Sequence, residues 1–323
     1  CIRDSINSMK KNKFLFCIGL LLTVATIVNA QSVTWISSTE GNVWQKSKVK
    51  LQSKSEQNPV LQVDGTENGV AFKNWGTTFN ELCWDALGLL TRTEQDEILY
   101  NIFSPQGDLR ITRGRISMGA NDYARSWYSC DEVEGDFELR YFNINRDKQT
   151  IIPFIRAAQK YNPNLTFWIS PWCPPSWMKI NGDYPVLSSP FNSLSEKQNY
   201  LLYGATGGQV DENEMKLTGA RDGVFPRQLA TTDFMIQDPR YLQTYADYFC
   251  RFIDAYKEQG IPIDMVMYQN EAYSYTPYPG CAWTATGTIR FNKEYLAPTL
   301  RQMHPEVKLY LGTFNTNRQD HVE

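Results

Sequence analysis

Asn270-Glu271 places an amide and a carboxylate side by side at the end of an apolar run, Ile263 to Tyr268. If that run is a parallel strand of an α/β barrel, the pair lies on the face where such barrels carry their catalytic groups. A glutamate there can act as general acid and base, and the neighbouring amide can hydrogen-bond a sugar hydroxyl. The alternative is an ordinary pair of polar surface residues, so the context of the pair decides between the two.

Polar and aromatic residues follow other predicted strands in the same way. Residues Gly119–Tyr123 follow a strand predicted over 109–118, and Pro171–Lys179 follow one predicted over 165–170. Phe314-Asn315 follows a strand predicted over 308–313. Because parallel strands all end on one face of a barrel, these segments predict an active-site rim.

Each candidate at this rim has a second interpretation. The Asp122 carboxylate can grip vicinal sugar hydroxyls with its two oxygens, or it can cap a turn. Trp172 can form a flat platform under a sugar ring, or belong to the core. Arg115, inside a predicted strand, fits a pocket floor or a structural ion pair. Trp177 and Trp283 are more typical of core or rim packing.

Composition excludes several other chemistries. The chain has two histidines, His304 and His321, which rules out a credible Ser-His-Asp triad, and it has no glycine-rich phosphate loop. The spacing of the cysteines matches no zinc pattern, and buried structural cysteine is the better expectation for most of those after residue 30. A formal net charge of −3 gives no reason to expect nucleic acid as a partner.

The N-terminal residues are typical of a secretory signal. Met9 is followed by lysines and then by an apolar run from Phe14 to Val28, and cleavage is expected after Ala30. The run has about 15 residues, whereas a spanning helix needs about 20, so we expect a cleavable signal and no stable membrane insertion. Residues 1–8 are expected to be translated upstream sequence. This predicts a secreted or periplasmic protein.

Helices and strands are expected to alternate after residue 75, which implies a parallel sheet and an α/β class. Thr91 and Glu94 form a capping box for a helix through Phe103. Asp238-Pro239 opens another helix, as an N-cap followed by proline. Further helices are predicted over 151–161 and 292–303. Residues 32–70 are polar and favour two or three short strands, with turns at 40–42 and 64–65.

The chain resembles glycoside hydrolase family 30, the family of glucosylceramidases and endo-β-1,6-glucanases. The matching stretches are GTTFNE at 76–81, RISMGANDY at 115–123, SPWCPPSWMK at 170–179 and QNE at 269–271. The text FNELCWDA at 79–86 resembles the bacterial branch acting on β-glucans. Two positions depart from the usual pattern, Ser117 and Ala272, where the family often has proline. Neither removes a reacting group.

The resemblance implies a (β/α)8 TIM barrel with a side β-domain, and retaining hydrolysis of β-glucosidic bonds through two carboxylates. Glu271 would be the acid/base. Asp122, Trp172 and Asn270 would line the subsite of the cleaved sugar, with Arg115 beneath. The implied substrate is a β-glucan or β-glucoside, such as β-1,6-glucan or glucosylceramide. No metal or organic cofactor is implied, since carboxylates suffice.

A retaining mechanism also needs a nucleophilic carboxylate about 5–5.5 Å from the acid/base. In the family it follows a later barrel strand, and no carboxylate here has that context. We therefore expect residues 31–72 to contribute strands of the side β-domain and 73–323 the first part of an incomplete barrel, with the nucleophile beyond residue 323. The alternatives are a glycan-binding barrel without catalysis, or an inactive fragment. The polar segment 187–232 is either a variable surface loop or a loop that shapes a substrate cleft.

Overall fold

The computed structural model describes residues 32–50, 75–194, 233–272 and 276–313. The chain divides into two compact units, Cys1–Ala71 and Phe72–Glu323, which are considered separately. Predictions for the signal segment, for the turn at 64–65 and for most of segment 187–232 concern residues outside the described ranges. Among the helices that are described, none combines the length and the apolar character needed to cross a membrane.

The first unit contains an antiparallel hairpin. Strand β1 (Ser32–Thr39) pairs with β2 (Asn42–Lys50) around the turn predicted at 40–42. Gly41 has a φ of 81°, a left-handed conformation that glycine adopts without a steric penalty. The pairing register shifts between Ser37 and Thr39, so the hairpin is irregular beside its turn.

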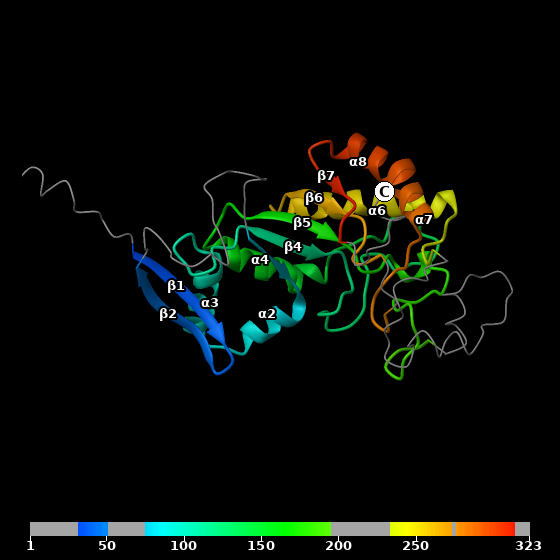
Figure 1. Ribbon diagram of the computed structural model, residues 1–323. Helices are drawn as coiled ribbons and strands as arrows, with labels where there is room; N and C mark the ends of the chain where they lie inside the picture. Colours follow the sequence, from blue (N-terminus) through cyan, green and yellow to red (C-terminus); the bar gives the residue numbers. More distant parts are fainter. Residues whose placement is uncertain (1–31, 51–74, 195–232, 273–275, 314–323) are drawn as a thin grey trace, which may run out of the picture. The chain divides into compact units, whose positions relative to one another are not determined.

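The second unit is built on a five-stranded parallel sheet in the order β3-β4-β5-β6-β7 (Figure 1). The strands are β3 (Gly76–Phe79), β4 (Arg113–Ser117), β5 (Thr166–Ser170), β6 (Ile263–Met267) and β7 (Lys308–Tyr310). Each strand pairs with the next one along the chain, as consecutive strands of a (β/α)8 barrel do. The predicted α/β class and parallel pairing are confirmed.

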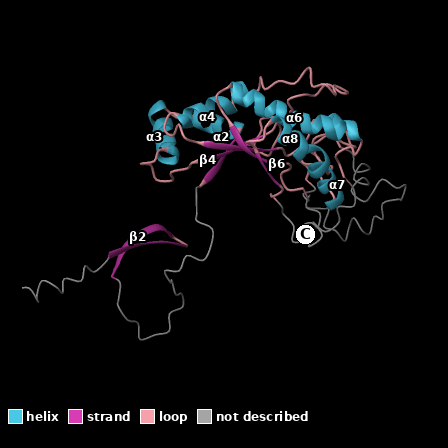
Figure 2. Cartoon of the chain, turned by 90° about the horizontal axis from the view of Figure 1, so that it is seen from above, coloured by secondary structure: helices cyan, strands magenta, loops and turns pink. Residues whose placement is uncertain are grey.

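Helices lie along one side of this sheet (Figure 2). They are α2 (Glu81–Gly88), α3 (Arg92–Phe103), α4 (Ile151–Gln159), α6 (Pro239–Glu258), α7 (Ala285–Arg290) and α8 (Ala297–Met303), the last two joined by a π-helical turn over Phe291–Leu296. The capping box of Thr91 and Glu94 is confirmed, as is the Asp238 cap with proline at the first position. Helix α2 was not predicted, because it is short and is set mainly by its Asn80 cap.

Two predicted elements have different limits in the structure. Strand β4 begins at Arg113 rather than at residue 109, because the chain before it turns through Arg110, which has a φ of 52°. The helix predicted over 292–303 begins earlier, at Ala285, where the Thr284 side chain caps it. The remaining strands agree with prediction to within three residues at either end.

The two faces of the sheet differ in burial. Phe79, Ile116, Ile169 and Val266 lie side by side in the register and are fully buried on the helix-covered face. A side chain at Gly114 would collide with the rings of Phe79 and Phe167, so this position has room only for glycine. Arg115 and Trp168 lie on the opposite face and are half-buried. The sheet thus turns its apolar layer to the helices and presents Arg115 on the other side.

Candidate active site

Arg115 connects β4 with the ends of β5 and β6. From the middle of β4, its Nη2 donates hydrogen bonds to Asn270 Oδ1 at 2.7 Å and to Ser170 Oγ at 2.7 Å, and its Nε donates to Ser170 Oγ at 3.0 Å. The main-chain N–H of Asn270 in turn donates to the Pro171 carbonyl at 2.7 Å. The arginine therefore fixes the amide next to Glu271.

Aromatic rings enclose the same guanidinium. Its carbon lies 4.2 Å from the ring centroid of Trp172 and 4.8 Å from that of Trp168, within the range of cation–π attraction. The Trp172 indole N–H is buried and faces the Asp122 carboxylate without a well-aligned hydrogen bond. Trp172 thus contacts the predicted site residues rather than lying in a remote part of the core.

The charged groups of the rim act on one another. Burial lowers the pKa of Arg115 to about 10, and the charges of Asp122 and Glu271 oppose this effect. The pKa of Asp122 is raised, mainly by partial desolvation even though the residue is exposed, and also by the charge of Glu271, while Trp172 and Arg115 act in the opposite direction. All five residues predicted from the sequence are therefore brought together. Arg115 still carries its charge at neutral pH, and it lies close enough to both carboxylates for their charges to act on it.

Comparisons with known proteins find relatives of this sequence. The model of the glycosyl hydrolase family 30 TIM-barrel domain matches residues 72–189. Putative glucosylceramidase 4 of Caenorhabditis elegans is 27% identical over 77% of this chain and 40% of that protein. Endo-1,6-beta-D-glucanase neg1 of Aspergillus fumigatus is 24% identical over 81% of this chain and 48% of that protein. The chain is thus related to glycoside hydrolase family 30, whose domain matches residues 72–189.

Solved structures agree on the fold. The endo-beta1,6-glucanase BT3312 superposes with a TM-score of 0.56 at 22% identity, over 77% of this chain and 46% of that one. SrfJ from Salmonella typhimurium gives a TM-score of 0.60 at 18% identity, over 85% and 52%. The described sheet is thus part of a TIM barrel. The chain spans less than half the length of both curated relatives named above.

The main chain of Glu271 has an unusual conformation. The residue is half-buried and has a φ of 48°, in the left-handed region that non-glycine residues rarely adopt.

The residue before the Asn-Glu pair was not predicted to belong to the site. Gln269 is buried, its Nε2 donates to the Trp172 carbonyl at 2.6 Å, and its Oε1 accepts from Trp283 Nε1 at 3.2 Å. An uncharged polar side chain directly after an apolar strand was the signal that could have found it.

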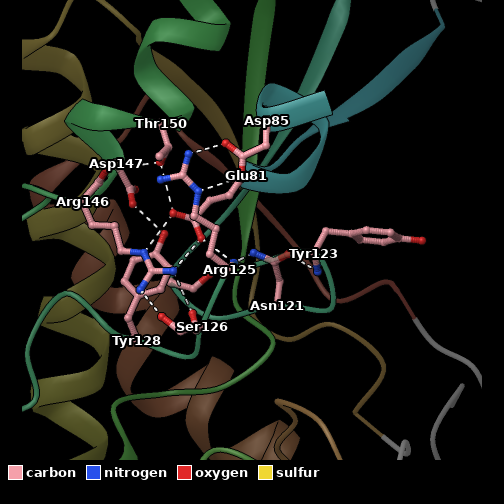
Figure 3. Close-up of polar contacts among 11 residues, drawn as sticks. Glu81, Asp85, Asn121, Tyr123, Arg125, Ser126, Tyr128, Arg146, Asp147 and Thr150 are labelled. Carbon is pink, nitrogen blue, oxygen red and sulfur yellow. Dashed lines mark hydrogen bonds and ion pairs between the residues drawn. The ribbon is translucent and has the colours of Figure 1, made fainter. Parts of the chain in front are cut away.

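A second group missed from sequence supports the loop that carries Asp122 (Figure 3). The Glu81 carboxylate, fully buried at the start of α2, accepts hydrogen bonds from Arg146 and from the main-chain N–H of Arg125 at 2.8 Å. Burial raises the pKa of Glu81, but the Arg146 and Arg125 hydrogen bonds and the Arg146 charge outweigh it, so the pKa is lowered overall. Glu81 is therefore an anion that holds the loop after β4.

Lys179 fixes the loop after β5 in a different way. Its buried ammonium donates to the carbonyls of Tyr184, Pro185 and Gly280, at 2.7, 3.0 and 2.9 Å. Three acceptors satisfy all three donors of the ammonium group, so this lysine joins two loops and is not a candidate for proton transfer. Trp177 and Trp283 are buried, as the packing interpretation predicted.

The described part of the chain offers no cluster of three or more histidine, cysteine, aspartate or glutamate side chains suited to a metal ion. Its five cysteines are free thiols, and all but Cys83 are buried. What the rim does offer is an amide, an arginine, aromatic faces and two carboxylates. These groups suit hydrogen bonding and stacking of a sugar together with proton transfer.

Proposed function

We propose that the full-length protein is a retaining glycoside hydrolase that cleaves β-glucosidic bonds, with Glu271 as acid/base. The observation that carries this proposal is the hydrogen bond from Arg115 to Asn270. Arg115 also contacts the ring of Trp172, and the charge of Asp122 acts on it, so it links the Asn-Glu pair to both of these residues. The relation to family 30 supports the reaction class. The names of the relatives, glucosylceramidases and endo-1,6-glucanases, support a β-linked glucose substrate.

In this mechanism Glu271 first protonates the departing glycosidic oxygen and then takes the proton of the incoming water. Asn270 and Asp122 hydrogen-bond hydroxyls of the sugar that is cleaved. Trp172 supplies an apolar face for the ring. Arg115 keeps Asn270 in place from below. The nucleophile is assigned to a carboxylate beyond residue 323, about 5–5.5 Å from Glu271 as retention of configuration requires.

The proposal includes export of the protein. The lysines after Met9 and the apolar run that ends before Ala30 fit a cleaved signal, so the enzyme would meet its glycan in a periplasmic or extracellular space. N-terminal sequencing of the mature protein checks the expected cleavage after Ala30. An intact N-terminus on the isolated protein would contradict export by this route.

The test is Glu271→Gln in the full-length gene product, assayed with 2,4-dinitrophenyl and alkyl β-glucosides, β-1,6-glucan and glucosylceramide. Loss of a general acid should lower turnover of the poor leaving groups roughly 100- to 10,000-fold and spare the activated one far more. Azide should rescue the variant and give a β-glycosyl azide. Glu258→Gln, at an exposed position on α6, is the matched control.

Two results would count against the proposal. Unchanged turnover of alkyl glucosides by Glu271→Gln would remove the acid/base assignment. Binding of β-1,6-glucan without any release of sugar by the wild-type protein would favour a glycan-binding barrel instead.

A further inference from the structure

The backbone of Glu271 is strained at the point where the proposed proton transfer occurs. Its φ of 48° costs a non-glycine residue about 1–2 kcal/mol relative to ordinary conformations. Such a conformation persists only where the surrounding structure determines it, and it tends to occur at functional sites. The contacts that hold Glu271 in this conformation are therefore expected to matter for its chemistry.

Thr313 makes the most direct of these contacts. It lies three residues past the end of β7, the neighbour of β6 in the sheet. Its Oγ1 accepts a hydrogen bond from the Glu271 N–H at 3.1 Å and donates one to the Gln269 carbonyl at 2.7 Å. A hydroxyl has one donor and two acceptor sites, so a single side chain can bridge both ends of the Gln269–Glu271 segment.

The neighbouring peptides are held from other directions. The Asn270 N–H donates to the Pro171 carbonyl at 2.7 Å, and the Trp283 N–H donates to the Ala272 carbonyl at 2.9 Å. These main-chain bonds fix the residues before and after Glu271, and they survive any side-chain substitution at residue 313. The bond to the Glu271 N–H differs because it depends on the Thr313 hydroxyl.

We propose that Thr313 is a positioning residue for the acid/base: its hydroxyl fixes the Glu271 main chain in the left-handed conformation that directs the carboxylate at the glycosidic oxygen. The inference rests on the proposed function, because it gives Glu271 its role. Removing the hydroxyl leaves the Glu271 N–H and the Gln269 carbonyl without this partner, and the segment relaxes toward an unstrained φ. The carboxylate then moves relative to the leaving group, while the binding residues Asp122 and Trp172 keep their own supports.

The experiment compares Thr313→Val, which keeps the shape and removes the hydroxyl, with Thr313→Ser, which keeps the hydroxyl. Both are made in the full-length gene product, and kcat/KM is measured for 2,4-dinitrophenyl and alkyl β-glucosides. Misplacing a catalytic group by a fraction of an ångström to 1 Å costs up to about 100-fold, so Thr313→Val should lose about 10- to 100-fold on alkyl glucosides. The loss on the activated substrate, which needs little acid assistance, should be much smaller, and Thr313→Ser should restore both rates.

Thr112→Val is the matched control, because the buried Thr112 hydroxyl has no hydrogen-bond partner and the residue precedes β4 at its opposite end. A second measurement uses the Glu271→Gln background, where Thr313→Val should cause little further loss on alkyl glucosides. If Thr313→Val does not fold, by its circular dichroism and thermal transition, Thr313→Ala replaces it in the same comparison.

Equal losses on both substrates, failure of Thr313→Ser to restore activity, or an unaltered Thr313→Val enzyme would each overturn the proposal. The proposed function fails in a different way, through unchanged alkyl glucoside turnover by Glu271→Gln alone. The two failures are therefore distinguishable.

Discussion

Arg146 binds the buried carboxylate of Glu81 with two parallel hydrogen bonds, Nε to Oε1 at 2.9 Å and Nη2 to Oε2 at 2.6 Å. The pair joins residues 65 positions apart, one following β3 and the other in the loop between β4 and α4. Thr150 adds a weaker bond to Oε1 at 3.3 Å, and Arg146 also binds the carbonyl of Ser126 at 2.9 Å (Figure 3). This ion pair is the anchor of the loop that carries Asp122.

Glu81→Gln is expected to destabilise the protein. The substitution replaces the counter-ion of Arg146 with a buried, uncharged amide. Removing one partner of a buried ion pair lowers the free energy of unfolding by about 3 kcal/mol at the lower end of the usual range. The lower end of this range applies because 29% of the Arg146 side chain is exposed to solvent. Urea unfolding measures the change. Glu138→Gln is the control, since its ion pair with Arg140 is exposed on both sides and should contribute nothing measurable.

The same substitution is expected to weaken sugar binding. Two hydrogen bonds connect the start of α2 with the residues just after Asp122. The Leu82 N–H donates to the Tyr123 carbonyl at 3.2 Å, and the Arg125 N–H donates to Glu81 Oε2 at 2.8 Å. Loosening them should raise KM for a β-glucoside more than it lowers kcat. In an Asp122→Ala background, Glu81→Gln should raise KM no further. An additive double variant would show that Glu81 does not act through Asp122.

Asp147 should make the stability of the protein depend on pH. It is fully buried between the hydroxyls of Tyr128 and Tyr256, each donating at 2.6 Å. Burial raises its pKa from 3.8 to about 6, although both tyrosines and the charge of Arg146 oppose this, and the charge of Glu81 adds to it. A raised pKa means that the folded state binds the proton more tightly. The contribution of this proton binding to the stability of the fold is fully present below about pH 3.8 and is lost as the pH rises through about 6.

Asp147→Asn tests this expectation. A rise of about two pKa units corresponds to about 3 kcal/mol, which is an upper value for the stability that wild type loses relative to the variant between pH 4 and pH 7. Unfolding free energies of both proteins across that range give the difference. Glu81 has a lowered pKa and works in the opposite sense, since its contribution is lost as the pH falls. Because both proteins retain Glu81, its effect cancels in the comparison. A difference that does not vary with pH would contradict the role of Asp147.

The polar residues that follow the strands could be predicted from the sequence, but the residues that hold them in place could not. Four of the site residues could be grouped because parallel strands end on one face: Asp122, Trp172, Asn270 and Glu271. The place of Arg115 beneath them followed from the family resemblance, since this residue lies inside β4. The strands themselves followed from apolar runs between helix caps such as the Thr91 box.

The supporting residues were missed for a physical reason. Glu81, Gln269 and Thr313 act through a few hydrogen bonds to residues distant in the sequence, and such bonds leave no periodic pattern in a sequence. The left-handed φ of Glu271 is likewise invisible from residue type, because glutamate gives no signal for that conformation. Only the packed structure shows which segments these side chains hold in place.

Arg115→Lys provides a test of the arrangement beneath the Asn-Glu pair. A lysine can replace the charge, but it cannot donate in a fixed plane to both Ser170 and Asn270 while stacking on Trp172. Loss of a charged hydrogen bond is worth about 1.5–3 kcal/mol, so kcat/KM for β-glucosides should fall about 10- to 100-fold.

Arg113→Lys, two residues earlier on the same strand, is the matched control for that variant. Arg113 pairs with Asp264 and makes no contact with the Asn-Glu pair in the described structure, so lysine can retain its ion pair. The control should keep kcat/KM close to wild type. If the two variants lose activity equally, the loss reflects a general disturbance of β4, and the planar contact of Arg115 with Asn270 is not what positions the proposed acid/base.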